Sequence, residues 1–354
     1  MKIAHLIWGL DVGGAETMLV DIANEQALSA EVAIVVGNAA IDSTVFATLS
    51  SKVVTNLVRR PPGSRNPWHL LKLIHMLRKF SPDIVHAHQA SFSKIARTLS
   101  APMVLTVHET NVRLESIERY AAIYGISEAV RNDLLARHSI CSPTVIHNGI
   151  CFSKIPQKTS YGRFPFRIVQ VGLLSHDKKG QDILLRALQH VSGEMGDGQV
   201  LIDFIGAGTS REYLSNLAEQ LGVAKWCRFL GQQPRSVIYD QLRTYDLLVQ
   251  PSRYEGFGLT IVEAMAARVP VLVSDIEGPM EVIDHGNYGY FFWTGDHVDC
   301  GEKIALIMKD SQRDGVQEFL QGIAEYARRR FDVATTAKSY LDEYKKVILR
   351  STPA

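Results

Sequence analysis

The feature that most constrains the fold is an alternation of short apolar runs with helical patterns along the whole chain. In the first half, the apolar runs are residues 2–8, 31–36, 83–88, 102–108, 121–126 and 143–147. The segments between them place apolar residues at helical spacing, over 14–28, 68–80 and 127–138. Strands that alternate with helices form βαβ units, and such units build a mainly parallel sheet. We therefore predict an α/β fold.

The pattern stops at the polar segment QKTSYGRFP (157–165) and then begins again. The later predicted strands are 166–172, 200–206, 226–231, 246–251 and 269–274. A chain of 354 residues is long for a single core. We interpret 157–165 as a linker between two doubly wound domains, 1–160 and 161–331, with a cleft between them. Ligands of open parallel sheets bind beyond the carboxyl ends of the strands, so we expect the chemistry in those loops.

Composition narrows the class of protein. Hydrophobic residues make up 46% of the chain and charged residues 21%, as in a typical globular protein. No run of about 18 uncharged apolar residues occurs, which predicts that no segment spans a membrane. The N-terminal segment has the pattern of a first strand rather than of a signal peptide. The four cysteines, Cys141, Cys151, Cys227 and Cys300, lack CxxC spacing, so we expect neither a metal site nor a disulfide framework, which fits the cytoplasm.

The strongest site signal is SRYEGFGLTIVEAM (252–265), in which Glu255 and Glu263 stand eight residues apart. The segment follows a predicted buried strand and leads into a short helix. Gly256 and Gly258 allow close backbone approach, and the amides at a helix start bind anions and hydroxyls. In one interpretation Glu255 caps the helix and Glu263 is solvated. We favour the alternative, in which both carboxylates hold a ligand, because a cap needs only one acid.

Two glycine-containing turns also follow predicted strands. Lys178, Lys179 and Gly180 precede a helix, where two cations would oppose the helix dipole unless an anion is bound there. Gly13 and Gly14 follow the first strand without the GxGxxG spacing of a dinucleotide site. A tight turn from strand to helix would also require glycine, so this second signal is weak when taken alone.

Three histidines, His86, His88 and His108, stand at the ends of two apolar strands. We expect their side chains to face the cleft. They are candidates for substrate contacts, and hydrogen-bonded structural histidines are the alternative. A metal site is not predicted, because no acidic or cysteine ligand is placed beside them.

These segments together resemble the group 1 glycosyltransferases, retaining sugar-nucleotide enzymes of the GT-B fold. The hallmark of that family is a Glu, seven residues and a second Glu, and here it reads EGFGLTIVEA (255–264). The resemblance covers the whole chain and is densest from 166 to 295. It implies two Rossmann-like domains, the first for the acceptor and the second for the nucleotide sugar. It also implies that a C-terminal helix, 332–354, packs back on the first domain.

The resemblance further implies roles for single residues. Glu255 would contact the donor sugar and Glu263 the ribose hydroxyls, while Lys178 and Lys179 would hold the diphosphate. His108 would lie near the reacting sugar. The catalytic set is then Glu255, His108 and Lys179. The remaining donor-binding positions are Gly13, Gly14, Gly206, Gly231, Phe257, Gly258 and Leu259.

One position departs from the family pattern. An Arg that would help to clamp the diphosphate is replaced here by Leu173. Positive charge at this place binds the diphosphate and stabilises it as a leaving group. We expect Lys178 or His176 to compensate.

The segment 52–97 is strongly basic, with nine Lys and Arg residues against Asp83 alone. Nucleic acid is not the expected partner, because no aromatic-rich RNA motif accompanies the charge. An anionic membrane surface, contacted through 59–79, is one interpretation. An ordinary helix that packs on the sheet is the other. The candidate acceptor or membrane residues are Arg59, Arg60, Arg65, His86 and His88, and the predicted apolar stripe of the helix is Leu70, Leu71, Ile74 and Leu77.

We therefore predict a metal-independent, retaining hexosyltransferase that uses a nucleotide sugar, UDP-linked by preference. The expected acceptor is a hydroxyl of a glycan or lipid-linked saccharide, in the synthesis of bacterial surface polysaccharide or lipopolysaccharide. The expected location is the cytoplasm, peripheral to the inner face of the membrane. Two alternatives stay open: a sugar-nucleotide 2-epimerase of the same fold, and a non-catalytic protein that binds sugar nucleotides.

Overall fold

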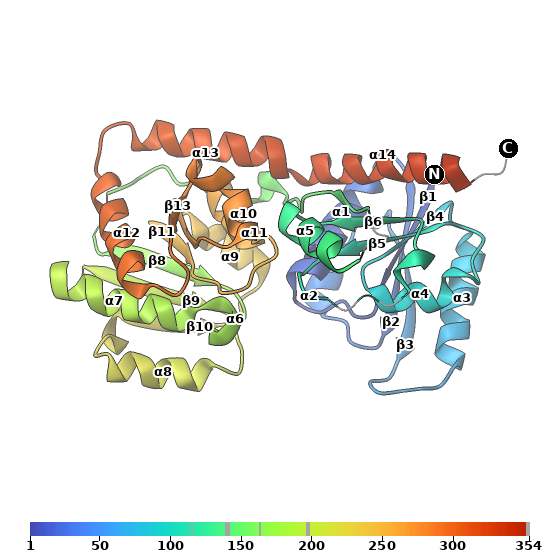
Figure 1. Cartoon of the computed structure of the whole chain (residues 1–354), viewed down its shortest axis with the longest axis horizontal. Helices are drawn as coiled ribbons and strands as arrows, with labels where there is room; N and C mark the ends of the chain where they lie inside the picture. Colours follow the sequence, from blue (N-terminus) through green and yellow to red (C-terminus); the bar gives the residue numbers. More distant parts are fainter. Residues whose placement is uncertain (113, 115, 139–141, 163, 196–198, 352–354) are drawn as a thin grey trace. The chain divides into compact units, whose positions relative to one another are not determined.

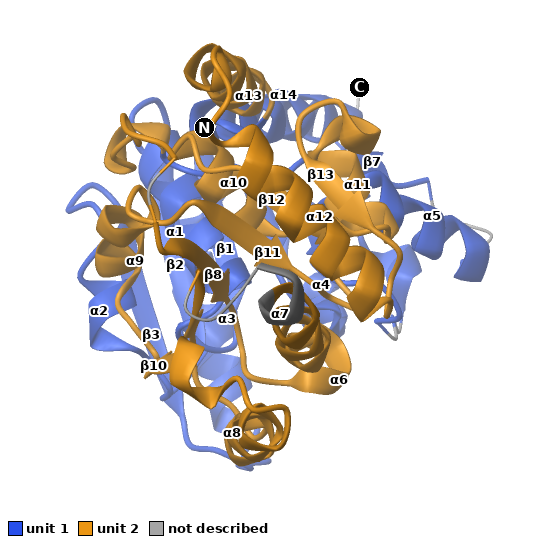
Figure 2. Cartoon of the chain, turned by 90° about the vertical axis from the view of Figure 1, so that its left-hand side faces the viewer, with its two compact units in different colours: residues 1–151, 331–354 blue, residues 152–330 orange. Residues whose placement is uncertain are grey.

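The computed structural model describes residues 1–112, 114, 116–138, 142–162, 164–195 and 199–351. The chain forms two compact units, which Figure 2 shows in separate colours. The first unit comprises residues 1–151 and 331–354, and the second comprises residues 152–330. Each unit contains a parallel sheet with helices packed against it (Figure 1). The predicted α/β fold with two parallel-sheet domains is thus confirmed.

The sheet of the first unit has the strand order β3-β2-β1-β4-β5-β6-β7. Its strands are β1 (Lys2–Ile7), β2 (Glu31–Asn38), β3 (Val54–Arg60), β4 (Ile84–Ala87), β5 (Met103–Val107), β6 (Ala122–Gly125) and β7 (Thr144–Val145). All recorded strand pairs in it are parallel, and His5 in β1 lies beside His86 in β4. The strand order reverses between β1 and β4. Such a reversal is where doubly wound sheets place their ligands.

In the described part of the first unit, six helices accompany this sheet: α1 (Gly14–Gln26), α2 (Ser43–Phe46), α3 (Trp68–Phe80), α4 (Ser93–Ala96), α5 (Glu128–Arg137) and α14 (Val333–Ser351). The C-terminal helix α14 packs against α1, although more than 300 residues separate their starting points in the sequence. Ser127 caps α5 by accepting a hydrogen bond from the amide of Val130. Three short 3₁₀ segments are Ala90–Phe92, Ile117–Arg119 and Phe152–Lys154, the last at the start of the second unit.

The sheet of the second unit has the order β10-β9-β8-β11-β12-β13, and its recorded pairs are also parallel. Its strands are β8 (Phe166–Val171), β9 (Val200–Ile205), β10 (Cys227–Gly231), β11 (Leu247–Gln250), β12 (Val271–Ser274) and β13 (Tyr290–Phe292). Here the order reverses between β8 and β11. The loops that follow these two strands carry Lys179 and Glu255.

The helices of the second unit are α6 (His176–Lys179), α7 (Gln181–Met195), α8 (Arg211–Gln220), α9 (Arg235–Leu242), α10 (Leu259–Ala266), α11 (Glu277–Val282), α12 (His297–Asp310) and α13 (Val316–Phe331). Two further 3₁₀ segments are Ala224–Trp226 and Asp284–Gly286. Apolar side chains from α7 and α12, which lie side by side, and from the central strands form a continuous buried core. This core gives the site loops a rigid base.

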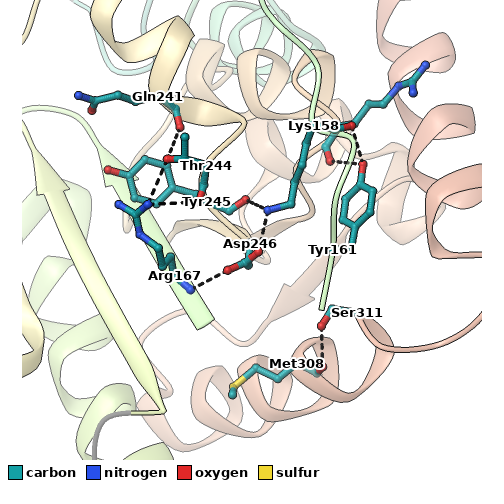
Figure 3. A network of polar contacts seen from close by, with 10 residues as sticks. Lys158, Tyr161, Arg167, Gln241, Thr244, Tyr245, Asp246, Met308 and Ser311 are labelled. Atoms are coloured by element: carbon teal, nitrogen blue, oxygen red, sulfur yellow. Dashed lines mark hydrogen bonds and ion pairs between the residues drawn. The ribbon is translucent and has the colours of Figure 1, made fainter. Parts of the chain in front are cut away.

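The predicted linker, 157–165, packs on the second unit where the structure describes it (Figure 3). The Lys158 ammonium is buried and contacts both the carbonyl oxygen of Tyr245 and the carboxylate of Asp246, each at 2.6 Å. The hydroxyl of Tyr161 donates to the carbonyl oxygens of Lys158 and Arg268. A buried ammonium is costly unless it is paired with a charge. The contact of Lys158 with Asp246 therefore holds this segment against the second unit. The compact units divide near residue 152, whereas the sequence pattern placed the boundary after residue 160.

Two strands and one helix face differ from the sequence-based expectation. The edge strands β3 and β13 were not predicted, because β3 ends in Arg59 and Arg60 and β13 is only three residues long. Helix α3 has the predicted bounds, but it buries Leu73, Ile74 and Leu77 and leaves Leu71 exposed. It packs on β2 and β3. In the described part of the chain, no helix combines the length and apolar character needed to cross a membrane.

Candidate active site

The reversal point of the second sheet brings together an ammonium group and a carboxylate from residues that are 76 positions apart in the sequence. The Nζ atom of Lys179 lies 2.5 Å from Oε2 of Glu255, and both side chains are mostly buried. Glu255 Oε2 also accepts a hydrogen bond from the side-chain amide of Gln250, at 3.3 Å. The two residues that the sequence selected independently are thus direct partners.

Local backbone contacts explain why these loops meet. Helix α6 ends at Gly180, which has a φ of 65°. A side chain at Gly180 would place its Cβ 1.8 Å from the carbonyl oxygen of Pro251, so only glycine lets the two segments approach. The amides of Arg253 and Tyr254 then donate to the carbonyl oxygen of Lys178, at 2.9 and 3.2 Å.

Lys178 and Lys179 precede α7, as expected, but they also form the last turn of a short helix, α6, that the sequence analysis did not predict. Positive charge is compatible with a helix C-terminus. The argument that a bound anion is needed to offset an unfavourable dipole therefore does not apply.

The interpretation of Glu255 as a helix cap is wrong. Helix α10 begins after Gly258, whose φ of 100° is favourable only for glycine, and no side chain caps it. Phe257 is buried, and Leu259 is the first helical residue. The glycine turn therefore leaves the first amides of α10 without side-chain caps, as a backbone site for sugar hydroxyls or phosphate requires.

The interpretation of Glu263 as a solvated side chain is also wrong, because this residue is only 7% exposed. Its Oε1 accepts a hydrogen bond from the hydroxyl of Tyr239 at 3.1 Å and lies 3.4 Å from Nε of Arg235. Both partners come from α9, the helix that follows β10. The sequence analysis missed them. Their spacing of four residues on one helix face was the available signal.

The region around Leu173 is rich in charge, although Leu173 itself is 60% exposed and apolar. Arg253 forms two hydrogen bonds with Asp182, at 2.8 and 2.9 Å, and a third with the carbonyl oxygen of His176. Burial would raise the pKa of Asp182, but the hydrogen bonds and charge of Arg253, its own backbone amide and His176 together hold that pKa below its ordinary value. His176 is held by Ser210 and Asp177.

The other predicted donor-binding glycines lie in two places. In the second unit, Gly206 follows β9 and its amide donates to the carbonyl oxygen of Gly231 at 2.8 Å. In the first unit, Gly13 is the N-cap residue of α1 in extended conformation, and Gly14 starts the helix. Gly13 and Gly14 thus belong to a different unit from Lys179 and Glu255.

The three histidines lie together at the reversal point of the first sheet. His86 lies inside β4 and is fully buried, rather than beyond the strand end as expected. Its ring nitrogens contact the hydroxyls of Tyr344 at 2.5 Å and Thr106 at 2.7 Å. His88 and His108 follow β4 and β5 and are 3.2 Å apart. The sequence analysis missed His5, which also contacts His88; a histidine inside an apolar strand was the available signal.

The candidate acceptor and membrane residues lie in two places: Arg59, Arg60 and Arg65 at and just after the edge strand β3, and the two histidines at the central strand β4. Arg59 and Arg65 are exposed. The guanidinium of Arg60 donates twice to the carbonyl oxygen of Ser64 and lies over the ring of Trp8. Arg60 thus holds the loop that follows β3, whereas the side chains of Arg59 and Arg65 are exposed to solvent.

Comparison with known proteins gives two family matches that together span most of the chain. Residues 154–330 match the family described as "Glycosyl transferases group 1". Residues 12–154 match the family described as "Glycosyltransferase Family 4". The first match covers the whole site around Lys179, Glu255 and Glu263.

Similar proteins and structures agree with these matches. A phosphatidyl-myo-inositol mannosyltransferase of Mycobacterium leprae is 26% identical over 283 residues, which is 75% of this chain and 74% of that protein. The fold is similar to Anabaena Alr3699/HepE solved with UDP and glucose, with a TM-score of 0.79, 21% identity, and coverage of 98% of this chain and 99% of that chain. It is also similar to sucrose-phosphate synthase from Thermosynechococcus elongatus, with a TM-score of 0.82, 15% identity, and coverage of 99% and 100%.

Proposed function

The chain belongs to the group 1 glycosyl transferases, and on this premise we propose that it is a retaining hexosyltransferase using a UDP-sugar. The observation that carries the proposal is the pair of Lys179 and Glu255 at the reversal point of the second sheet. A cation that can meet a diphosphate lies there beside a carboxylate that can accept sugar hydroxyls. The solved structure of HepE with UDP and glucose, which has the same fold, supports the choice of donor.

In this proposal each end of the donor has its own carboxylate. Glu255 accepts hydrogen bonds from the sugar, and Glu263 accepts them from the two vicinal ribose hydroxyls. Tyr239 and Arg235 hold the Glu263 carboxylate in place for that contact. The amides at the start of α10 and the cations of Lys178 and Lys179 bind the diphosphate, so that no metal ion is required.

The reaction is a transfer with retention at the anomeric carbon. The bond from that carbon to the diphosphate oxygen breaks, and a bond to the acceptor oxygen forms on the same face of the sugar. The proton of the acceptor hydroxyl goes to the departing phosphate. Lys179 stabilises the negative charge that develops on the leaving group. The contribution of the protein is therefore positioning and charge stabilisation.

The acceptor we propose is a hydroxyl of a glycan or lipid-linked saccharide, at the inner face of the cytoplasmic membrane in bacterial surface polysaccharide synthesis. The name of the mannosyltransferase relative, which specifies a phosphatidyl-inositol acceptor, supports a lipid-linked class. Exposed Arg59, Arg65 and Trp68, at the edge strand β3 and the start of α3, supply cations and an aromatic ring for an anionic membrane surface.

A donor screen tests the proposal directly. Hydrolysis and binding are measured with UDP-, GDP- and ADP-sugars, by release of the nucleoside diphosphate and by calorimetry. We expect slow hydrolysis and binding with UDP-sugars. The anomeric configuration of a transfer product, read by NMR, then tests retention. Neither turnover nor binding with any of these donors would contradict the proposed function.

A further inference from the structure

The first unit contains a continuous row of hydrogen-bonded imidazoles that the proposed reaction does not use. The side-chain oxygen of Gln26 lies 2.8 Å from Nε2 of His5. Nδ1 of His5 lies 3.1 Å from Nε2 of His88, and Nδ1 of His88 lies 3.2 Å from Nε2 of His108. The row thus runs from α1 through β1 and the end of β4 to the end of β5.

The order of protons along this row follows from the partner at its inner end. A neutral imidazole has one N–H donor and one bare acceptor nitrogen. Because the Gln26 oxygen can only accept, His5 donates from Nε2 and accepts at Nδ1. His88 must then donate from Nε2, and by the same rule His108 donates from Nε2. The Nδ1 atom of His108 is left as the bare acceptor.

The environment keeps all of these rings neutral. Burial lowers the pKa of His5 and of His108 to about 4, with the hydrogen bond from His5 to Gln26 and the charge of Glu109 opposing it. Burial and the neighbouring rings hold the pKa of His88 and of His86 well below the ordinary value. Three further titratable groups pack against the ring of His86, which itself lies beside His5 and His88: Tyr340 and Tyr344 from α14 and Tyr124 from β6.

The outer end of the row lacks a partner. Among the residues that the structure describes, Nδ1 of His108 is buried and accepts no hydrogen bond. A buried acceptor left in this state costs about 1–3 kcal/mol. A hydroxyl that reaches the atom would recover that free energy.

We propose that Gln26, His5 and His88 are positioning residues that fix the tautomer of His108, so that its Nδ1 accepts a hydrogen bond from a substrate hydroxyl. The part of this inference that concerns substrate rests on the proposed glycosyl transfer, together with the place near the reacting sugar that the family resemblance implies for His108. The order of protons along the row does not, because it follows from the acceptor oxygen of Gln26 at the inner end and from the hydrogen bonds between the rings.

A metal ion bound between these histidines is the alternative to the hydrogen-bonded row. One nitrogen each from His5, His86 and His88 lies within 4.8 Å of the others, a spacing that also fits a bound metal ion. Hydrogen bonds account for the same rings, since His86 has partners at both nitrogens. Elemental analysis of the purified protein separates the two cases, and one equivalent of zinc or another transition metal would overturn the relay.

The tautomer is measured directly by two-bond ¹H–¹⁵N NMR on full-length protein labelled at histidine, with His108 assigned from a His108→Asn variant. We expect His108 in the wild type to be protonated at Nε2 only. A proton on Nδ1 in the wild type would overturn the proposal without any need for activity. If the tautomer is as expected but no donor is turned over, the proposed function fails and the relay stands.

Two variants test whether Gln26 determines the tautomer of His108. Gln26→Met keeps the shape of the side chain and removes the oxygen, whereas Thr106→Val removes a buried hydroxyl on the far side of His86. We expect Gln26→Met to give both His108 tautomers and a loss in kcat of about tenfold, the effect of one ordinary hydrogen bond. Thr106→Val is expected to keep one tautomer. An unchanged tautomer in a folded Gln26→Met protein would overturn the proposal.

Discussion

At the scale of single residues, the site is defined by which groups are in contact. Glu255 and Glu263 look alike in the sequence, yet one pairs with Lys179 and the other with Tyr239. The first pairing places Glu255 beside the group that would meet the diphosphate. The second holds Glu263 against helix α9. The two acids therefore have different predicted effects when removed.

We expect Glu255→Ala to lower kcat by about 10²–10³-fold, the range for loss of one group that stabilises developing charge. Glu263→Ala should mainly weaken nucleotide binding, by about tenfold or more, because it removes charge-assisted hydrogen bonds. Steady-state kinetics and calorimetry with UDP separate the two effects. Glu219→Ala, on the exposed face of α8, serves as the control. Small and equal effects of the two substitutions would contradict the assigned roles.

Leu173 allows a gain-of-function test. Its side chain is 60% exposed, so an arginine can replace it without entering the core. An added guanidinium near the diphosphate should tighten UDP binding by about tenfold, since a hydrogen bond between charged groups contributes roughly 1.5–3 kcal/mol. Calorimetry on Leu173→Arg measures this change, and Leu173→Gln controls for size. Equal Kd values for Arg, Gln and Leu would indicate that the diphosphate does not bind there.

At the scale of elements, the segment before β8 shows how one buried ion pair holds a connection. Lys158 and Asp246 are both nearly buried, and Asp246 also accepts from the amide of Arg167. Lys158→Met leaves the carboxylate without its cation. We expect a loss of about 3–5 kcal/mol in the stability of the second unit.

Hydrogen exchange of peptides from β8 and β11 measures this loss without assuming that the two units unfold together. The matched control is Arg313→Met, which removes the pair between the exposed Arg313 and a partly buried Asp310 and should cost less than about 1 kcal/mol. If the backbone amides of these strands are protected from exchange to the same degree in both variants, the buried pair has no special role in stability.

The basic edge formed by β3 and the start of α3 leads to a membrane-binding prediction. Arg59, Arg65 and Trp68 are exposed, whereas Arg60 is tied to Ser64. We expect co-sedimentation with vesicles containing anionic lipid to fall when Arg59, Arg60 and Arg65 are replaced by Ser. Each cation near the surface should contribute about 1 kcal/mol to the free energy of membrane binding. Arg60→Ser alone should have less effect than Arg59→Ser with Arg65→Ser. Unchanged binding of the triple variant would leave α3 as an ordinary sheet-packing helix.

At the scale of the whole molecule, the buried histidines give the first unit a stability that depends on pH. In the unfolded chain an imidazole takes up a proton below about pH 6.5, whereas His5 and His108 stay neutral in the fold down to about pH 4. The unfolded state therefore binds more protons in this window. Stability should fall as the pH drops from about 6.5 to 4, by about 1.4 kcal/mol per pH unit for each such histidine.

Hydrogen exchange at several pH values, corrected for the intrinsic rate, tests this dependence on peptides from β1 and β4. Peptides from the second sheet are the internal control, because none of the six strands of that sheet contains a histidine. We expect protection to decline toward pH 4 in the first unit more steeply than in the second. Parallel declines in both units would contradict the prediction.

The sequence by itself determined the class of fold, because apolar periodicity is local. A run of alternating strands and helices can form βαβ units in only one general way, and the predicted bounds of α3 and of most strands agree with the structure. It also indicated the family, because EGFGLTIVEA carries the glycine turn and the two acids at the spacing that is the hallmark of that family. The edge strands β3 and β13 were missed, since edge strands need little apolar pattern.

Only the tertiary structure decided which side chains meet. Lys179 reaches Glu255 because the strand order reverses between β8 and β11, which brings together loops 76 residues apart. Gln26, His5, His88 and His108 form one row because α1, β1, β4 and β5 converge in the same way in the first unit. Periodicity specifies which face of an element is buried, but contacts between distant elements depend on the order of strands in the sheet.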